Sequence, residues 1–166
     1  MEIGKIYFDM DGVLADFESG IRTYCHMEPV AQSIICNNDD LWAAVKKVDH
    51  FYLQLKPYEG AVEMFMELYR EYGHKVEILS GIPRARRGIV TARQDKIDWV
   101  HKYLSPDVKC NIVYREEKQN YCTGPQDILI DDFDVTIEQW ESKGGSGICH
   151  VSIEDTKNKI RQLKQQ

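Results

Sequence analysis

Two aspartates stand two residues apart at the end of a short apolar run near the start of the sequence, in "IYFDMDGVLADF" (6–17). Asp9 and Asp11 have no packing role there, because burying a carboxylate is costly unless it is paired or binds a metal. Gly12 follows directly and lets the backbone approach a ligand closely. The stretch therefore predicts a chemical site at the end of a buried strand.

Polar residues also end two later apolar runs. "VEILSG" ends in Ser80 and Gly81, and "DILIDD" ends in Asp131 and Asp132. The carboxyl ends of parallel strands meet at one edge of a sheet, so we expect these residues to share a cleft with the first two aspartates. Carboxylates in one cleft repel each other unless a cation lies between them, and Mg²⁺ is the usual choice beside a phosphate. The serine hydroxyl and nearby backbone amides are candidate donors to phosphate oxygens.

A lysine is needed to balance the negative charge of the carboxylates and of a phosphate. Lys118 in "YREEKQN" and Lys96 in "DKIDWV" are the candidates upstream of "DILIDD". The residues by themselves leave the choice between the two open.

A calcium-binding loop or ordinary turns would account for these residues less well. An EF-hand loop needs glycine at its sixth position and glutamate at its twelfth. Counted from Asp9, glycine is fourth and the twelfth residue is Gly20. Asp131-Asp132 alone would be a helix cap and turn, and Ser80-Gly81 alone an ordinary loop. Only their joint placement at strand ends favours a functional site.

Strands and helices alternate along the chain, which predicts an α/β fold with a Rossmann-like, doubly wound parallel sheet. Apolar runs predict strands at 5–9, 76–81, 110–114, 127–132 and 147–152. Helical spacing predicts helices at 59–72, 84–104, 134–143 and 153–164. In the second of these helices, we expect Ile97, Val100 and Leu104 to share the buried face.

One connection is too long for a simple crossover. About 65 residues separate the first two strands, and the helix at 59–72 alone would suffice. We therefore expect residues 17–57 to form a small helical cap inserted after the first strand. Residues 1–16 and 58–166 would form the α/β core domain.

Composition narrows the function classes. The chain has 166 residues and a net charge of −6, which argues against a partner that is a polymeric nucleic acid. No apolar stretch approaches the roughly 20 residues that cross a membrane, and no signal-peptide pattern opens the sequence, so we expect a cytoplasmic protein. The five cysteines form no CxxC pair and are interpreted as reduced thiols.

At this point the residues resemble a known family. "DMDGVLAD", a strand that ends in Ser80, a lysine, and "DD" after an apolar strand are similar to the four motifs of the haloacid dehalogenase (HAD) superfamily of phosphohydrolases. The similarity is closer to the 5'(3')-deoxyribonucleotidases, through "FYLQLKPYEGAVE", "DKIDWVHKYL" and "LIDD". It extends from residue 6 to about 133.

The resemblance implies a mechanism. Asp9 would be the nucleophile that forms an aspartyl-phosphate, and Asp11 the general acid and then the general base. Mg²⁺ would be held by Asp9, the main-chain carbonyl of Asp11, and the pair Asp131 and Asp132. Of that pair, Asp132 is favoured as the direct ligand.

The resemblance also implies substrate contacts. Ser80 and Lys118 would bind phosphoryl oxygens, with Lys96 as the alternative lysine. Aromatic side chains of the cap would stack on a nucleobase: Phe17, Phe51 and Tyr52, with Trp42 as a further candidate. Phe51 and Tyr52 fit core packing equally well.

The sequence departs from this family after its second strand. It has "LSGIPRARRG" where the family shows a threonine-serine-proline run, so Gly81 lacks a second hydroxyl. Arg84, Arg86 and Arg87 would compensate as a basic rim, or would only form a solvated helix start.

The sequence therefore predicts a Mg²⁺-dependent phosphatase for a small phosphorylated substrate, most simply a nucleoside monophosphate. A phosphatase for another metabolite, such as a sugar phosphate, and a non-catalytic phosphate-binding module are the alternatives. No membrane partner is expected, and a homodimer is compatible with the sequence.

Overall fold

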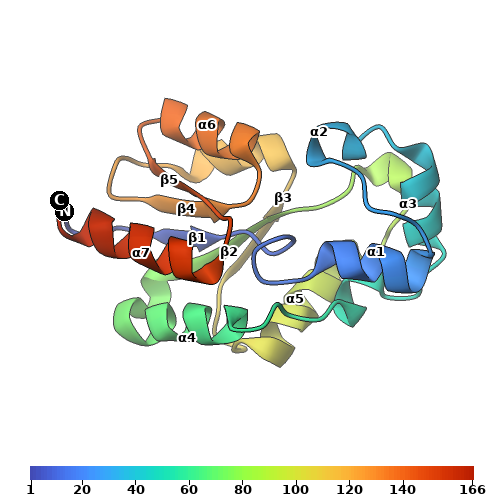
Figure 1. The fold of residues 1–166 in the computed structure, drawn as a ribbon, viewed down its shortest axis with the longest axis horizontal. Coiled ribbons are helices and arrows are strands. Elements are labelled where there is room, and N and C mark those ends of the chain that lie inside the picture. Colours follow the sequence, from blue (N-terminus) through green and yellow to red (C-terminus); the bar gives the residue numbers. More distant parts are fainter.

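A five-stranded, fully parallel sheet forms the centre of the computed structural model, which describes residues 1–166 (Figure 1). The strand order is β3-β2-β1-β4-β5. The strands are β1 Ile6–Phe8, β2 Val76–Gly81, β3 Cys110–Val113, β4 Ile128–Asp131 and β5 Ser146–Cys149. The predicted Rossmann-like α/β fold is confirmed, and the strand order reverses beside β1, where such sheets bind ligands.

Alternating side chains give the sheet two buried faces. Ile6 and Phe8 point to one face, where the ring of Phe8 lies 5.1 Å from that of Phe65. Tyr7 points to the other face, where its ring lies 5.5 Å from that of Trp140. The first face is covered by α4 Ala61–Tyr72, α5 Ala92–Tyr103 and α7 Ile153–Lys164, and the second by α6 Asp134–Ser142. Both faces of the sheet are therefore buried beneath helices, as is usual for a parallel sheet.

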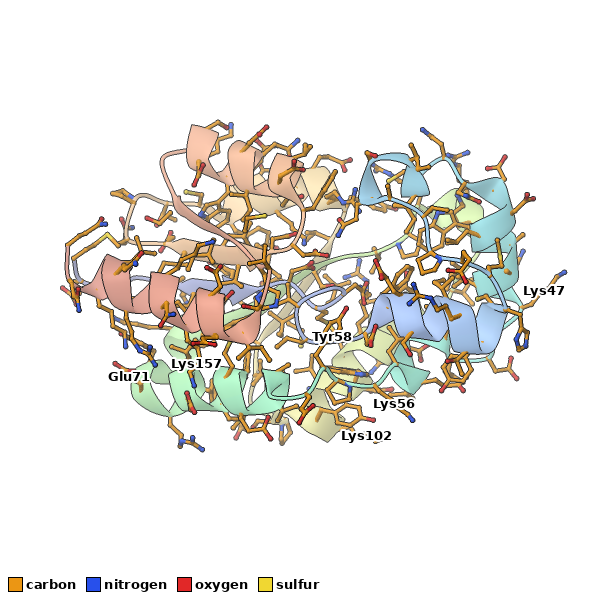
Figure 2. All side chains as sticks on the ribbon, viewed as in Figure 1. Lys47, Lys56, Tyr58, Glu71, Lys102 and Lys157 are labelled. Carbon is orange, nitrogen blue, oxygen red and sulfur yellow. The ribbon has the colours of Figure 1, made fainter.

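Ion pairs join α4 and α7 along the protein surface. Lys157 lies 2.8 Å from Glu67, and Lys164 lies 2.8 Å from Glu71. Figure 2 labels one member of each pair, Lys157 and Glu71. None of the helices has the length and hydropathy of a membrane-spanning segment.

The long connection between β1 and β2 is helical, as its sequence predicts. It contains α1 Phe17–Cys25, α2 Gln32–Ile35, α3 Asp39–Lys46 and the 3-10 helix η1 Phe51–Gln54. These helices gather beyond the carboxyl ends of the strands (blue to cyan in Figure 1). Asp16 caps α1 through the Ser19 amide, and Asn38 caps α3 through the Leu41 amide. We keep the name cap for residues 17–57, whose independence from the core stays a prediction.

The predicted single helix over 84–104 is wrong at its start. A 3-10 helix, η3 Ala85–Arg87, ends at Gly88, whose φ of 69° is in the left-handed region. The α-helix begins only at Ala92. Glycine adopts this backbone conformation at little cost, so it breaks the helical pattern here.

The buried face of α5 also differs from the prediction. Val100 is buried, but Ile97 and Leu104 are only half-buried. The other large buried side chains of α5 are those of Trp99 and of two charged residues, Asp95 and Lys96. The helix therefore carries charge into the interior of the protein.

Two contacts tie α5 to the base of the cap. The indole Nε1 of Trp99 donates a 2.7 Å hydrogen bond to the carbonyl of Leu55. His50 Nδ1 lies 2.7 Å from Oδ1 of Asp95, which is only 2% exposed. The join between cap and core is thus partly electrostatic.

This ion pair should make stability depend on pH. The hydrogen bond to Asp95, and then its charge, raise the pKa of His50 above 6.5. The stabilisation is then complete below pH 6.5 and is lost as the pH rises through the raised pKa. We expect His50→Ala to lower Tm most at acidic pH and progressively less at alkaline pH, measured by thermal unfolding across that range. His101→Ala, which removes an exposed histidine of α5, is the control, and the same pH trend in both variants would contradict the prediction.

Candidate active site

A tight loop after β1 presents the two aspartates of the first motif. The Asp9 amide donates a 2.9 Å hydrogen bond to the carbonyl of Ile130, and the Met10 carbonyl accepts bonds from the amides of residues 13, 14 and 15. Gly12 has a φ of 84°, and a Cβ at this position would lie 2.0 Å from Oδ2 of Asp132. Only glycine lets the loop approach the second acidic motif this closely.

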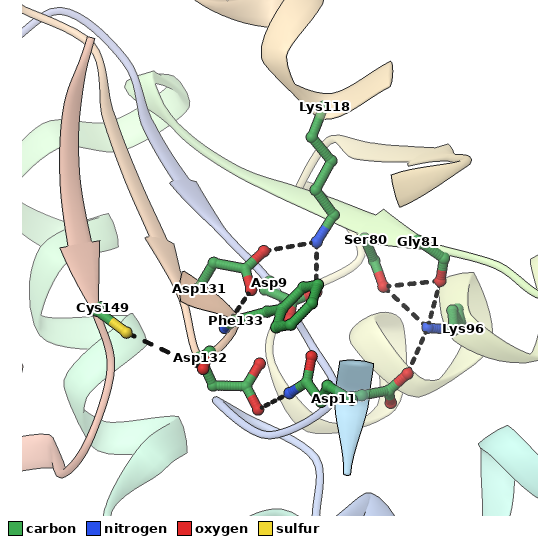
Figure 3. Close-up of polar contacts among 11 residues, drawn as sticks. Asp9, Asp11, Ser80, Gly81, Lys96, Lys118, Asp131, Asp132, Phe133 and Cys149 are labelled. Carbon is green, nitrogen blue, oxygen red and sulfur yellow. Dashed lines mark hydrogen bonds and ion pairs between the residues drawn. The ribbon is translucent and has the colours of Figure 1, made fainter. Parts of the chain in front are cut away.

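Three carboxylates converge where β1 and β4 end (Figure 3). Asp9, Asp131 and Asp132 each offer an oxygen, and these oxygens lie within 4.8 Å of one another. Asp9 is 7% exposed and Asp131 is 1% exposed. Oδ1 of Asp132 is buried and has no hydrogen-bond partner. A cluster of carboxylate oxygens with an unused acceptor fits a hard divalent cation such as Mg²⁺.

The crowding of these groups changes their protonation. Burial raises the pKa of Asp132 to about 8, with further contributions from the charges of Asp9 and Asp131. Burial and the charge of Asp9 also raise the pKa of Asp131. Without a bound cation, the cluster therefore favours holding a proton.

Lys118 is the cation that offsets this charge. It lies in the 3-10 helix η4 Arg115–Tyr121, is 3% exposed, and places Nζ 2.9 Å from Oδ1 of Asp9 and 2.8 Å from Oδ2 of Asp131. Burial alone would lower the pKa of Lys118, but the charges of Asp131 and Asp9 outweigh burial and raise it. The lysine therefore stays charged between the two carboxylates.

A second buried lysine holds the other aspartate of the first motif. Lys96 of α5 is 1% exposed and places Nζ 2.8 Å from Oδ2 of Asp11, 2.9 Å from Oγ of Ser80 and 2.8 Å from the carbonyl oxygen of Gly81. Its ammonium also lies 4.6 Å from the centre of the Tyr52 ring. Oδ1 of Asp11 is buried without a partner. Asp9 and Asp11 are thus held by different lysines.

A cavity of about 720 Å³ opens above these groups. Its floor includes the acidic cluster and Lys118, and one wall comes from the cap. The cap contributes the aromatic residues Phe17, Trp42 and Tyr52. This size and mixed lining are typical of a site for a small organic ligand.

One residue predicted to contact the substrate lies outside the cavity lining. Phe51 is 1% exposed and does not line the cavity. Its ring packs 5.7 Å from that of Phe17 and 5.3 Å from that of Tyr52. Phe51 supports the aromatic wall from behind, which is the packing alternative for this residue.

Two further predicted residues lie behind the cavity wall. Ser80 is fully buried, and its hydroxyl accepts a hydrogen bond from Lys96, so neither side chain faces the cavity. Gly81 does line the cavity. Of the two candidate lysines, only Lys118 reaches the cavity. A direct contact of Ser80 with phosphate stays a prediction, since its hydroxyl here lies against Lys96.

The predicted basic rim is only partly formed. Arg84 and Arg87 line the cavity, but Arg86 is exposed outside it. Arg84 forms an ion pair with Glu116. Arg87 donates hydrogen bonds to Oδ1 of Asp39 and to a carbonyl of the cap. The two arginines therefore join segments of the cavity wall.

Sequence reasoning missed several polar residues that line the cavity, among them Arg115 and Gln32. Arg115 places its guanidinium 4.5 Å from the centre of the Phe133 ring, and Gln32 of the cap donates a hydrogen bond to Asp132. The position of Arg115, three residues before Lys118 in the same helical stretch, was a signal that could have revealed it. Gln32 lies in a short, mostly apolar segment without a motif, so no signal marked it.

A family model described as "5' nucleotidase, deoxy (Pyrimidine), cytosolic type C protein" matches residues 2–162 of the chain. The chain belongs to this family. The resemblance seen in the motifs is thereby confirmed for almost the whole chain.

Two curated relatives are described by the same activity. The chain is 27% identical over 146 residues to the mitochondrial 5'(3')-deoxyribonucleotidase of Homo sapiens, covering 77% of this chain and 61% of that protein. It is 28% identical over 114 residues to a protein of Vibrio phage KVP40 that is provisionally assigned the same activity, covering 69% and 59%. The chain therefore spans about three fifths of the length of these curated relatives.

Solved structures agree on the fold. YfnB from Bacillus subtilis, assigned to the HAD hydrolases and solved with magnesium, aligns with a TM-score of 0.60 at 12% identity. The alignment covers 89% of this chain and 86% of that one. At this identity, the likeness supports a HAD-like fold.

The raised pKa of Asp132 predicts how the stability of the metal-free protein depends on pH. The unfolded chain releases the Asp132 proton near pH 3.8, whereas the folded chain holds it up to about pH 8. The folded state therefore binds more protons in this window, and stability should fall as pH rises, by at most about 1.4 kcal/mol per pH unit. We expect Asp132→Asn to flatten this fall in urea unfolding with a chelator present. Asp107→Asn, at an exposed position, should keep the slope, and an unchanged slope in Asp132→Asn would contradict the prediction.

Proposed function

We propose that this protein is a Mg²⁺-dependent phosphatase that hydrolyses nucleoside monophosphates through an aspartyl-phosphate on Asp9. The observation that carries the proposal is the separate fixing of the two aspartates after β1. Asp9 forms an ion pair with Lys118 in the acidic cluster, whereas Asp11 forms an ion pair with Lys96 beside the cluster. Two carboxylates in different environments can act as nucleophile and as acid.

The donor set supports a metal site. Asp9 and Asp132, with the main-chain carbonyl of Asp11, would hold Mg²⁺, which supplies positive charge that offsets the carboxylates and the phosphate. Asp131 already accepts hydrogen bonds from Lys118 and from the Phe133 amide. Asp132 has a buried oxygen without a partner, which favours it over Asp131 as the direct ligand.

The chemical steps follow from the placement of side chains. An oxygen of Asp9 attacks phosphorus and the bond from phosphorus to the ester oxygen breaks, while Asp11 gives its proton to that oxygen as it leaves. Asp11 then takes a proton from water, and the water oxygen attacks the phosphorus of the aspartyl-phosphate. This step breaks the bond between phosphorus and the Asp9 oxygen, releases inorganic phosphate, and restores the Asp9 carboxylate and the protonated Asp11.

Cationic side chains would stabilise the phosphoryl group during these steps. Lys118 lines the cavity next to Asp9, and Arg115 lies on the same helical stretch. Preorganised donors of this kind contribute ~2.7–4 kcal/mol each to the transition state. Lys96 would instead hold Asp11 through one oxygen, leaving the other for proton transfer.

The aromatic wall supports a nucleotide as the substrate. Phe17, Trp42 and Tyr52 line the cavity on the cap side, and stacking on a base contributes ~1–3 kcal/mol. The names of the relatives point to deoxyribonucleotides. A sugar phosphate has no aromatic ring that could stack on these side chains. A cytoplasmic location and a homodimer stay predictions.

A substrate panel tests the proposal. We expect phosphate release from deoxynucleoside or ribonucleoside monophosphates to exceed release from sugar phosphates, because only the nucleotides fill the aromatic wall. Release should stop with a chelator and return with Mg²⁺. Activity on sugar phosphates alone would support the other phosphatase function, and no release from any substrate would support the non-catalytic module.

Substitution of the two aspartates separates their roles. We expect Asp9→Asn to lower kcat by at least about 10³-fold and Asp11→Asn by ~10²–10⁴-fold. In Asp11→Asn, formation of the phosphoenzyme should be less impaired with p-nitrophenyl phosphate than with a nucleotide, because p-nitrophenolate leaves without needing a proton. Rapid-quench measurement of phosphoenzyme formation would show this. Full activity in Asp9→Asn would overturn the assigned nucleophile, and Asp107→Asn provides the unaffected control.

A further inference from the structure

One residue of the cap reaches the acidic cluster of the core. Gln32 opens α2, lines the cavity, and donates a hydrogen bond from Nε2 to Oδ2 of Asp132, a residue 100 positions later in the sequence. Neither the strands nor the motifs of the core require this contact. It therefore links the cap directly to the acidic cluster.

The contact selects one oxygen of the Asp132 carboxylate. Oδ2 accepts the bond from Gln32 and also faces the loop at Gly12, where a Cβ would lie 2.0 Å away. Oδ1 is buried and has no partner. Figure 3 shows the second oxygen of Asp132 on the side of Asp9. With one oxygen occupied by an amide, the other is left for a cation.

The segment that carries Gln32 is itself fixed. Trp42 Nε1 donates a 2.8 Å hydrogen bond to the carbonyl of Ile35, the last residue of α2. Arg87, whose side chain is 9% exposed, lies 2.6 Å from both the carbonyl oxygen of Cys36 and Oδ1 of Asp39. These contacts hold α2 over the cavity, so the Gln32 amide is presented from a positioned helix.

We propose that Gln32 is a positioning residue for the metal site: its amide orients the Asp132 carboxylate so that Oδ1 is available to the divalent cation. The inference rests on the proposed function, since it assigns a role toward the same cation. A cap residue then contributes to cation affinity without touching the cation. Groups that hydrogen-bond to metal ligands typically change metal affinity by about 10–100-fold.

Gln32→Met is the sharpest test, because it keeps the length of the side chain and removes the donor. Binding of Mn²⁺, an ion with the same preference for oxygen ligands, is measured on substrate-free protein from the EPR signal of the free ion. We expect about 10–100-fold weaker binding in Gln32→Met and unchanged binding in Ser33→Ala, a control on the exposed side of α2. Activity should recover at high Mg²⁺, with kcat close to that of the unmodified protein.

Two further measurements distinguish a role at the metal site from a structural one. Thermal unfolding without metal should give nearly the same Tm for Gln32→Met and the unmodified protein, whereas a purely structural role would lower Tm and leave Mn²⁺ affinity unchanged. Asp132→Asn reports on the metal site itself. If it weakens Mn²⁺ binding while Gln32→Met stays within twofold of the unmodified protein, the role of Gln32 is overturned. If neither variant changes Mn²⁺ affinity, the metal site in the proposed function is wrong as well.

Discussion

The concentration of negative charge where β1 and β4 end is the constraint on which the rest of the site depends. Four carboxylates follow these two adjacent strands, and most of their area is removed from water. Ionised groups in such a place need partners, because water no longer stabilises them. The partners come from both sides of the strand ends: Lys118 from η4 and Lys96 from α5. The fold must therefore bring two distant helices to one point before the site can exist.

The two lysines also divide the carboxylates into two groups. Lys118 joins Asp9 to Asp131, whereas Lys96 joins Asp11 to β2 through Ser80 and Gly81. Buried ion pairs contribute little net stability, but removing one partner is costly, so they fix geometry strongly. Neighbouring aspartates in one loop can then have different surroundings, and this difference is what divided chemical roles require.

The sequence predicted the parts of the structure that follow from local periodicity. The strands and the meeting of the acidic motifs follow from apolar runs that end in polar residues, and the parallel orientation of the strands follows from their alternation with helices. The buried face of α5 was missed, because Lys96 and Asp95 look solvated until their partners, Asp11 and His50, are known. Adjacent aromatics raise the same difficulty: Tyr52 lines the cavity and Phe51 does not, and no periodicity separates them. Contacts between distant segments decide these cases.

Polar contacts join the cap to the core at its base, along its side and over the cavity. His50 meets Asp95 at the base, Arg87 meets the start of α3 along the side, and Gln32 meets Asp132 over the cavity. Each core partner lies in or beside the site: Asp95 precedes Lys96 on α5, Arg87 follows β2, and Asp132 belongs to the acidic cluster. Hydrogen bonds are directional, so a shift of the cap would change the orientation of these groups. The position of the cap and the geometry of the carboxylates are therefore not independent, and a ligand that contacts the aromatic wall would act on both.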